Sequence, residues 1–161
     1  MVRAESAPDR PLLARLYHAI LTEFVQEGRA PHYVVLSKQL GLPLEEIRQL
    51  LHRLGSLGLP IWLHPGTDLL ASFAPFSNLP THYRISCDGE ERWYGQCGLE
   101  SLAVSWLFPG REVSINGACL DCGESIRVRM RDGVVLDVDP PSAVGHVNLP
   151  LRHWRDDWPA T

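Results

Sequence analysis

The spacing of apolar residues changes at residues 74–82, and this change constrains what the chain can fold into. Before this segment, apolar side chains recur every three or four residues, which predicts amphipathic helices. After it, short β-branched and aromatic runs alternate with turn residues, which predicts strands. The segment holds Pro75 and Pro80 and is interpreted as a rigid linker. The sequence therefore predicts an α+β protein divided into a flexible tail over 1–10, a helical domain over 11–73, the linker over 74–82 and a second domain over 83–161.

Three helices and a hairpin are expected in the helical domain. The first helix begins near Pro11 and keeps its apolar spacing to Val25. A short second helix is expected over 34–40, and a third begins at Pro43, where a proline costs little. Apolar runs on both sides of the turn residues 65–68 predict a hairpin. This order is typical of a winged-helix arrangement, which we interpret as a structural platform.

The charge of the chain disfavours a nucleic-acid partner. Fifteen Lys and Arg stand against 19 Asp and Glu, a net charge of −4, whereas phosphate binding needs a basic surface. The expected third helix has a face of mixed charge, so it lacks the electrostatic attraction that gives nonspecific affinity for DNA. Residues 1–8 lack the apolar core of a signal peptide, and no apolar run reaches the roughly 20 residues of a membrane span. We therefore expect a cytoplasmic protein with no membrane partner.

The second domain is expected to hold a small mixed or antiparallel sheet and one helix, over 98–107, which follows a cysteine. Turn residues such as Arg131-Asp132-Gly133 separate the strands. Strands are expected at 83–87, 92–94, 112–116, 125–131, 134–138 and 143–149.

The segment around Cys97 carries the strongest chemical signal. Cys97 lies where an expected strand gives way to the expected helix. A thiolate at a helix N-terminus is stabilised by exposed N–H groups, so we expect the pKa of Cys97 to fall below the free value of about 8.5. Glu100 lies three residues later and projects on the same side. A thiolate beside a carboxylic acid can act as a nucleophile or soft-metal ligand with its own proton source. The alternative is a buried cysteine followed by a capping glutamate.

Cys119 and Cys122 bracket a turn with the spacing of half a zinc site. A structural zinc site needs two such pairs, and Cys87 and Cys97 are not spaced as the second, so structural zinc is less favoured. A soft ion held by two or three thiolates, drawn from Cys97, Cys119 and Cys122, fits the residues better. A tight turn with inert thiols is the alternative.

At these residues the chain resembles the organomercurial (alkylmercury) lyase family, often called MerB. The resemblance covers most of the chain and includes the winged-helix-like part and the Pro-Phe-Ser-x-x-Pro-Thr segment at 75–81. The run at 93–100 resembles the family's Tyr-Ala-x-Cys-Ala-x-Asp motif. The turn at 119–123 and the segment at 153–157 are also similar to family members. The domain at 83–161 is thus expected to be the MerB-like catalytic or metal-binding part.

The resemblance implies protonolysis of a carbon–mercury bond, with Cys97 as the mercury-binding thiolate and Glu100 as the proton donor. The hydrocarbon leaves and Hg(II) stays on the enzyme. Mercury is soft and prefers thiolates, while the acid delivers a proton to the departing carbon. No cofactor is required, because mercury belongs to the substrate and product, and small thiols are the expected partners for product release. A non-catalytic protein that binds a soft metal or metalloid, and a winged-helix metal-responsive regulator, are the alternatives.

Two features depart from the family pattern. The family acid is usually aspartate, and Glu100 is one methylene longer, which changes its reach. The family's second essential cysteine follows the segment that 153–157 resembles, and the sequence ends at Thr161, close to that position. The natural protein either lacks this cysteine or continues past Thr161. If it lacks the cysteine, Cys119 or Cys122 is the candidate second thiolate, an interpretation that predicts a short distance from one of them to Cys97.

Overall fold

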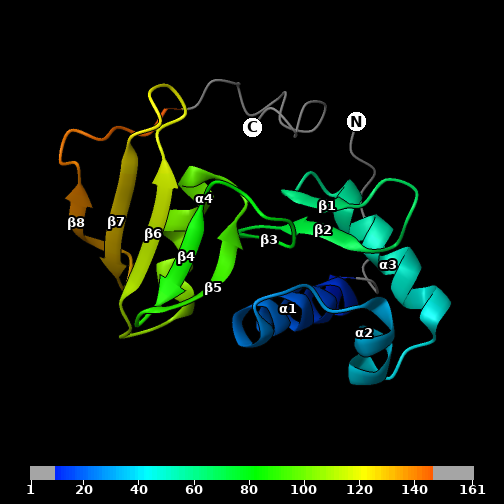
Figure 1. The fold of residues 1–161 in the computed structure, drawn as a ribbon. Helices are drawn as coiled ribbons and strands as arrows, with labels where there is room; N and C mark the ends of the chain where they lie inside the picture. The colour runs from blue at the N-terminus through cyan, green and yellow to red at the C-terminus, as the bar shows by residue number, and fades with distance from the viewer. Residues whose placement is uncertain (1–9, 147–161) are drawn as a thin grey trace. The chain divides into compact units, whose positions relative to one another are not determined.

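Both helices and strands are present, so the predicted α+β class is confirmed (Figure 1). The computed structural model describes residues 10–146. The chain divides into two compact units, residues 1–73 (unit 1) and 74–161 (unit 2). No helix in the described part of the chain is long and apolar enough to cross a membrane. The expected tail, except Arg10, and the segment at 153–157 lie outside the described residues.

Unit 1 holds three helices followed by a hairpin. The elements are α1 (Arg10–Glu27), α2 (Tyr33–Leu40), α3 (Leu44–Ser56), β1 (Ile61–Leu63) and β2 (Leu70–Phe73). β1 and β2 pair antiparallel, as the turn residues between them predict. The buried stripe of α1 has the expected helical spacing, and its members are Leu13, Leu16, Ile20 and Phe24.

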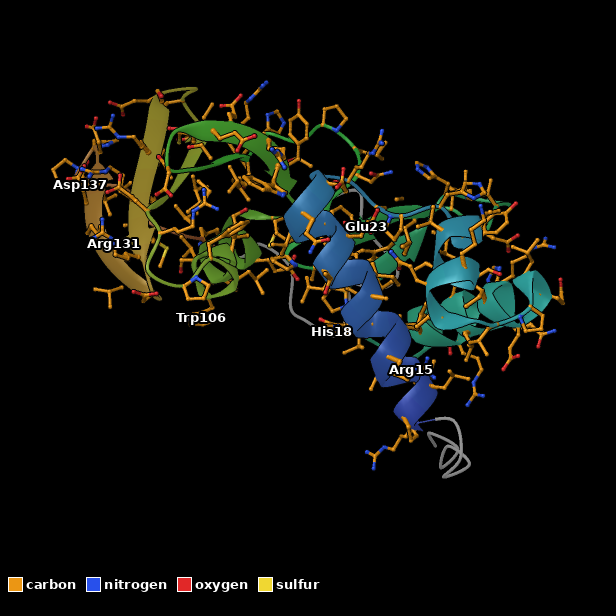
Figure 2. The ribbon with its side chains drawn as sticks, turned by 90° about the horizontal axis from the view of Figure 1, so that it is seen from below. Arg15, His18, Glu23, Trp106, Arg131 and Asp137 are labelled. Atoms are coloured by element: carbon orange, nitrogen blue, oxygen red, sulfur yellow. The ribbon has the colours of Figure 1, made fainter. Side chains whose placement is uncertain are left out.

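Aromatic packing joins α1 to the hairpin. The rings of Tyr17 and Phe73 have centroids 4.8 Å apart, and those of Phe24 and Phe73 are 6.4 Å apart. Phe24 and Phe73 are fully buried. Arg15 and His18 project from the other side of α1 and are exposed (Figure 2). The helix is therefore amphipathic, and its apolar face forms the core of unit 1.

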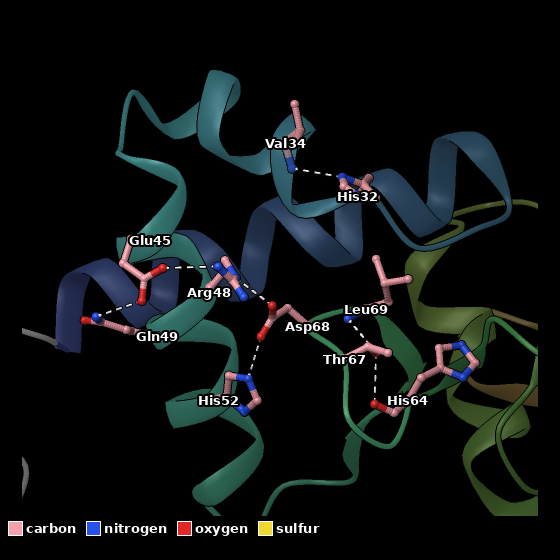
Figure 3. Close-up of polar contacts among 10 residues, drawn as sticks. All are labelled: His32, Val34, Glu45, Arg48, Gln49, His52, His64, Thr67, Asp68 and Leu69. Atoms are coloured by element: carbon pink, nitrogen blue, oxygen red, sulfur yellow. Dashed lines mark hydrogen bonds and ion pairs between the residues drawn. The ribbon is translucent and has the colours of Figure 1, made fainter.

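A polar cluster fixes the turn of the hairpin to α3 (Figure 3). Arg48 Nε donates to Asp68 Oδ2 at 2.5 Å, and His52 Nε2 lies 2.7 Å from Asp68 Oδ1. Hydrogen bonds to His52 and Arg48 lower the pKa of Asp68, which keeps it ionised at neutral pH. Arg48 thus pairs with acidic groups of its own unit, since it also bonds Glu45 at 3.2 Å.

Unit 2 is built on antiparallel strands, so of the expected mixed or antiparallel sheet the antiparallel form is present. The strands are β3 (Phe76–Ser77), β4 (Arg84–Cys87), β5 (Glu90–Gly95), β6 (Val113–Ala118), β7 (Ser125–Arg131) and β8 (Val134–Asp139). Within the unit they follow the order β3-β5-β4-β6-β7-β8. Two helical segments lie between β5 and β6, namely α4 (Gly98–Ala103) and the 3₁₀ helix η1 (Val104–Leu107). The core contains Trp93 and Phe108, whose rings meet edge to face at 4.9 Å.

Three elements of unit 2 differ from the sequence expectation. The segment 74–82, interpreted as a linker, contains β3, because Phe76 is fully buried and pairs with Gly95 of β5. The helix expected over 98–107 tightens into a 3₁₀ turn after Ala103. Residues 143–146 form no strand, and the rest of the strand expected at 143–149 lies outside the described residues.

Ser105 anchors η1 to the turn between β7 and β8. It is fully buried, its hydroxyl donates to Leu102 O at 3.1 Å, and it accepts the Gly133 N–H at 3.1 Å. We predict that Ser105→Ala lowers the free energy of unfolding by about 1–2 kcal/mol, because the Gly133 N–H loses its acceptor. Urea denaturation measures the change.

The matched control is Ser56→Ala. The Ser56 side chain is exposed, and its hydroxyl donates to Arg53 O at 2.7 Å within α3. Its replacement is expected to change stability by less than about 0.5 kcal/mol. Equal losses for the two variants would contradict the role given to Ser105.

Candidate functional site

Cys97 is the N-cap of α4, so its expected position between a strand and a helix is confirmed. Its backbone is extended, with φ −145° and ψ 172°, and its Sγ accepts the Glu100 N–H at 3.4 Å. Its carbonyl accepts the Ser101 N–H at 3.0 Å and the Ser101 hydroxyl at 2.6 Å. Just before it, the Gln96 N–H donates to Pro75 O at 2.9 Å. Backbone bonds therefore hold the sulfur in place from both sides.

Glu100 lies beside the Cys97 thiol, as the spacing predicted. The Glu100 N–H donates to Cys97 Sγ at 3.4 Å, and both side chains are half-buried. Burial raises the pKa of Glu100 above its ordinary value, although the bond from Cys97 opposes the rise. A carboxyl with a raised pKa holds its proton closer to neutral pH, which suits a proton donor.

The expected fall in the pKa of Cys97 is wrong. Burial raises the pKa of this thiol to about 11, and the neighbouring Glu100 carboxylate adds to the rise. The backbone N–H groups of Leu99 and Glu100 oppose it, but they do not offset the desolvation. The helix spans only six residues, so little aligned dipole faces the sulfur. Cys97 is therefore a protonated thiol at neutral pH until something displaces its proton.

Tyr83 also lies at this site, and sequence reasoning missed it. Burial raises the pKa of Tyr83, the nearby Cys97 sulfur adds to the rise, and the Gly98 N–H opposes it. A Cβ on Gly98 would lie 3.2 Å from Tyr83 Cε1, so this glycine leaves room for the ring. The register of the hairpin could have indicated Tyr83. The Gly95 N–H donates to Tyr83 O at 2.9 Å, and Gly95 lies two residues before Cys97, so this pairing brings Tyr83 near the thiol.

Cys119 and Cys122 lie in the turn between β6 and β7 and form a separate pair of thiols. Hydrogen bonds from the backbone N–H groups of Cys122 and Asp121, and from the Cys122 side chain, lower the pKa of Cys119. Within residues 10–146, no three His, Cys, Asp or Glu side chains form a group that could hold a metal ion. The structure thus brings Cys97 to Glu100 and Cys119 to Cys122, but it does not gather the three cysteines at one site.

Cys87 is the remaining cysteine, and it is fully buried in β4. Burial raises the pKa of its thiol, which makes it a poor nucleophile at neutral pH. All four cysteines are free thiols. Cys87 is therefore part of the core and not of the candidate site.

The two sulfur environments generate a testable difference in reactivity. Because only the thiolate is alkylated, we predict that iodoacetamide modifies Cys119 at a lower pH than Cys97. The Cys97 rate is expected to keep rising between about pH 7 and about pH 10. Glu100→Gln should raise the Cys97 rate several-fold, because it removes a carboxylate that raises this pKa. Peptide mass spectrometry measures both rates, and faster modification of Cys97 than of Cys119 at pH 7 would contradict the assignment.

A family model matches more than half of the chain. Residues 76–160 match MerB, alkylmercury lyase. The match contains Cys97, Glu100 and the turn at 119–122.

Curated relatives point to the same family, and a solved structure has a similar fold. The chain is 28% identical over 130 residues to an alkylmercury lyase of Staphylococcus epidermidis, and 30% identical over 135 residues to one of Bacillus cereus. Each alignment covers 81% of this chain and 56% of the relative, so the chain spans about half the length of these relatives. The mercury-bound form of MerB2 has a similar fold, with a TM-score of 0.54 and 19% identity over 81% of this chain and 68% of that one. The chain therefore belongs to the alkylmercury lyase family.

Proposed function

We propose that this protein cleaves carbon–mercury bonds by protonolysis, with Cys97 as the mercury-binding sulfur and Glu100 as the proton donor. The observation that carries the proposal is the position of Glu100 beside the Cys97 thiol at the start of α4, where the Glu100 N–H donates to Cys97 Sγ at 3.4 Å. It places a soft ligand and an acid side by side, as protonolysis requires. The relatives named alkylmercury lyase support the same reaction.

The proton balance follows from the resting state of the pair. The organomercurial cation binds the Cys97 sulfur, a sulfur–mercury bond forms, and the thiol proton passes to the Glu100 carboxylate. Glu100 then delivers this proton to the carbon as the carbon–mercury bond breaks, and the bond's electrons form the new carbon–hydrogen bond. The hydrocarbon leaves, and Hg(II) stays on Cys97 beside an ionised Glu100. The proton lost by the thiol is thus the one gained by the carbon.

The raised pKa of Cys97 suits this order of reaction steps. A thiol with a pKa of about 11 gives a basic thiolate, and basic thiolates donate electron density more strongly. Once bound, such a sulfur pushes density through mercury toward the carbon, which helps the carbon accept a proton. Burial of the pair also strengthens the electrostatic interaction between them.

Small thiols are the proposed partners for product release. Hg(II) on one protein sulfur remains open to attack by further soft ligands, so a small thiol can take it away. Mercury enters and leaves as part of substrate and product, and no resident cofactor enters the proposed reaction. We place this activity in the cytoplasm, where thiols are kept reduced.

Unit 1 is proposed to be a winged-helix-like platform. Three helices followed by an antiparallel hairpin support this arrangement. Arg48 of α3 is engaged with Asp68 and Glu45, which leaves less positive charge for a phosphate backbone. A DNA-binding regulator would instead show a gel shift at low salt, and we expect none.

Phenylmercury with excess small thiol tests the proposed reaction through the release of benzene. We predict that Cys97→Ser abolishes release and that Glu100→Gln lowers the rate by about 10²–10⁴-fold, the usual contribution of a positioned acid. Glu100→Asp should keep more activity than Glu100→Gln, because it keeps the acid and shifts only its reach. Gas chromatography quantifies the benzene.

The same assay separates turnover from binding alone. Stoichiometric mercury on Cys97 with no benzene from the wild-type chain would contradict the lyase proposal and favour a soft-metal binding protein. Benzene release unchanged in Glu100→Gln would contradict the role of this acid. Circular dichroism of each variant shows whether a loss of activity reflects a loss of fold.

A further inference from the structure

The turn between β6 and β7 carries two cysteines that are not needed to close it. The Cys119 N–H donates to Glu124 O at 2.8 Å, and the Gly123 N–H donates to Cys119 O at 2.9 Å. Gly123 has φ +77°, a conformation that favours glycine. These backbone bonds close the turn by themselves, so the fold of the loop needs neither sulfur.

The two sulfurs nevertheless converge inside this turn. The side chains of Cys119 and Cys122 are within hydrogen-bonding reach of each other. Backbone N–H groups of Cys122 and Asp121 donate to the Cys119 sulfur, and hydrogen bonds of this kind also tune metal-bound thiolates. Cys119 is half-buried and Cys122 is exposed, so one sulfur is fixed and the other faces solvent. The pair is therefore prepared for a ligand that takes two sulfurs.

The number of available ligands indicates which ligand fits. A tetrahedral zinc site needs four protein ligands, and within the described residues no third His, Cys, Asp or Glu joins this pair to hold a metal. Two thiolates without a third protein ligand suit a soft cation that accepts low coordination. Leu120 in the same turn is 71% exposed, so this side chain does not pack over the two sulfurs.

We propose that Cys119 and Cys122 form a second site, independent of Cys97, that binds a thiophilic cation such as Hg(II) between two thiolates. On binding, two S–H bonds are replaced by two S–Hg bonds, and two protons are released to solvent. No electron transfer is involved. The site goes beyond the proposed lyase reaction, because it would capture an inorganic cation whether or not the carbon–mercury bond is cleaved elsewhere in the chain.

Mercuric chloride in the presence of about 1 mM glutathione tests the site. Glutathione is a monothiol, and at this concentration it equals the effective concentration that a short tether gives to a second ligand. Glutathione should therefore remove mercury from a single protein sulfur more readily than from a pair of protein sulfurs. We predict that the Cys97→Ser chain retains one mercury after desalting. Adding Cys119→Ser or Cys122→Ser should remove it. Native mass spectrometry counts the bound metal.

Leu120→Ala in the Cys97→Ser chain is the matched control, and it should keep the mercury because it alters the same turn without removing a sulfur. Retention of mercury after loss of Cys119, or no retained mercury in Cys97→Ser, would overturn the proposal. Benzene release separates this result from the lyase proposal. Cys119→Ser should still release benzene from phenylmercury, whereas Cys97→Ser should not, so each proposal can fail alone.

Discussion

The backbone hydrogen bonds around Cys97 are the constraint on which the rest of the site depends. They tie the end of β5 to Pro75 and to Tyr83, and they tie the first turn of α4 to the Cys97 carbonyl. Because these bonds fix the backbone on both sides of the sulfur, Glu100 falls beside it one helical turn later. The chemistry of the pair then follows from its burial. Desolvation penalises both charged forms, so burial raises the pKa of the Cys97 thiol and the pKa of the Glu100 carboxyl.

The same physical rule gives opposite results at the two sulfur sites. Cys97 and Cys119 each accept backbone N–H groups in a turn-like geometry. At Cys97 desolvation outweighs these donors and raises the pKa, whereas at Cys119 the donors outweigh desolvation and lower it. One chain thus carries a basic, protonated sulfur beside an acid and a more easily ionised sulfur beside a second thiol. The first arrangement suits proton transfer, and the second suits capture of a soft cation.

The sequence indicated the parts of this structure that depend on local pattern. Apolar spacing predicted the three helices of unit 1 and most strands of unit 2, and the strand-to-helix junction at Cys97 followed from the change in pattern there. The sign of the Cys97 pKa shift could not be predicted, because burial depends on what packs over α4. The local pattern likewise did not indicate that Phe76 lies in a strand, because its partner Gly95 is distant in the sequence. Tyr83 needed the register of a hairpin and not a motif.

Turnover of phenylmercury in D₂O tests the central claim most directly, because it follows the transferred proton itself. The thiol and carboxyl protons of Cys97 and Glu100 exchange with solvent, so protonolysis predicts benzene that carries one deuterium. Mass spectrometry of the benzene reads the isotope. Benzene without deuterium would show that the hydrogen comes from a group that does not exchange, and this result would contradict proton delivery through the Cys97–Glu100 pair.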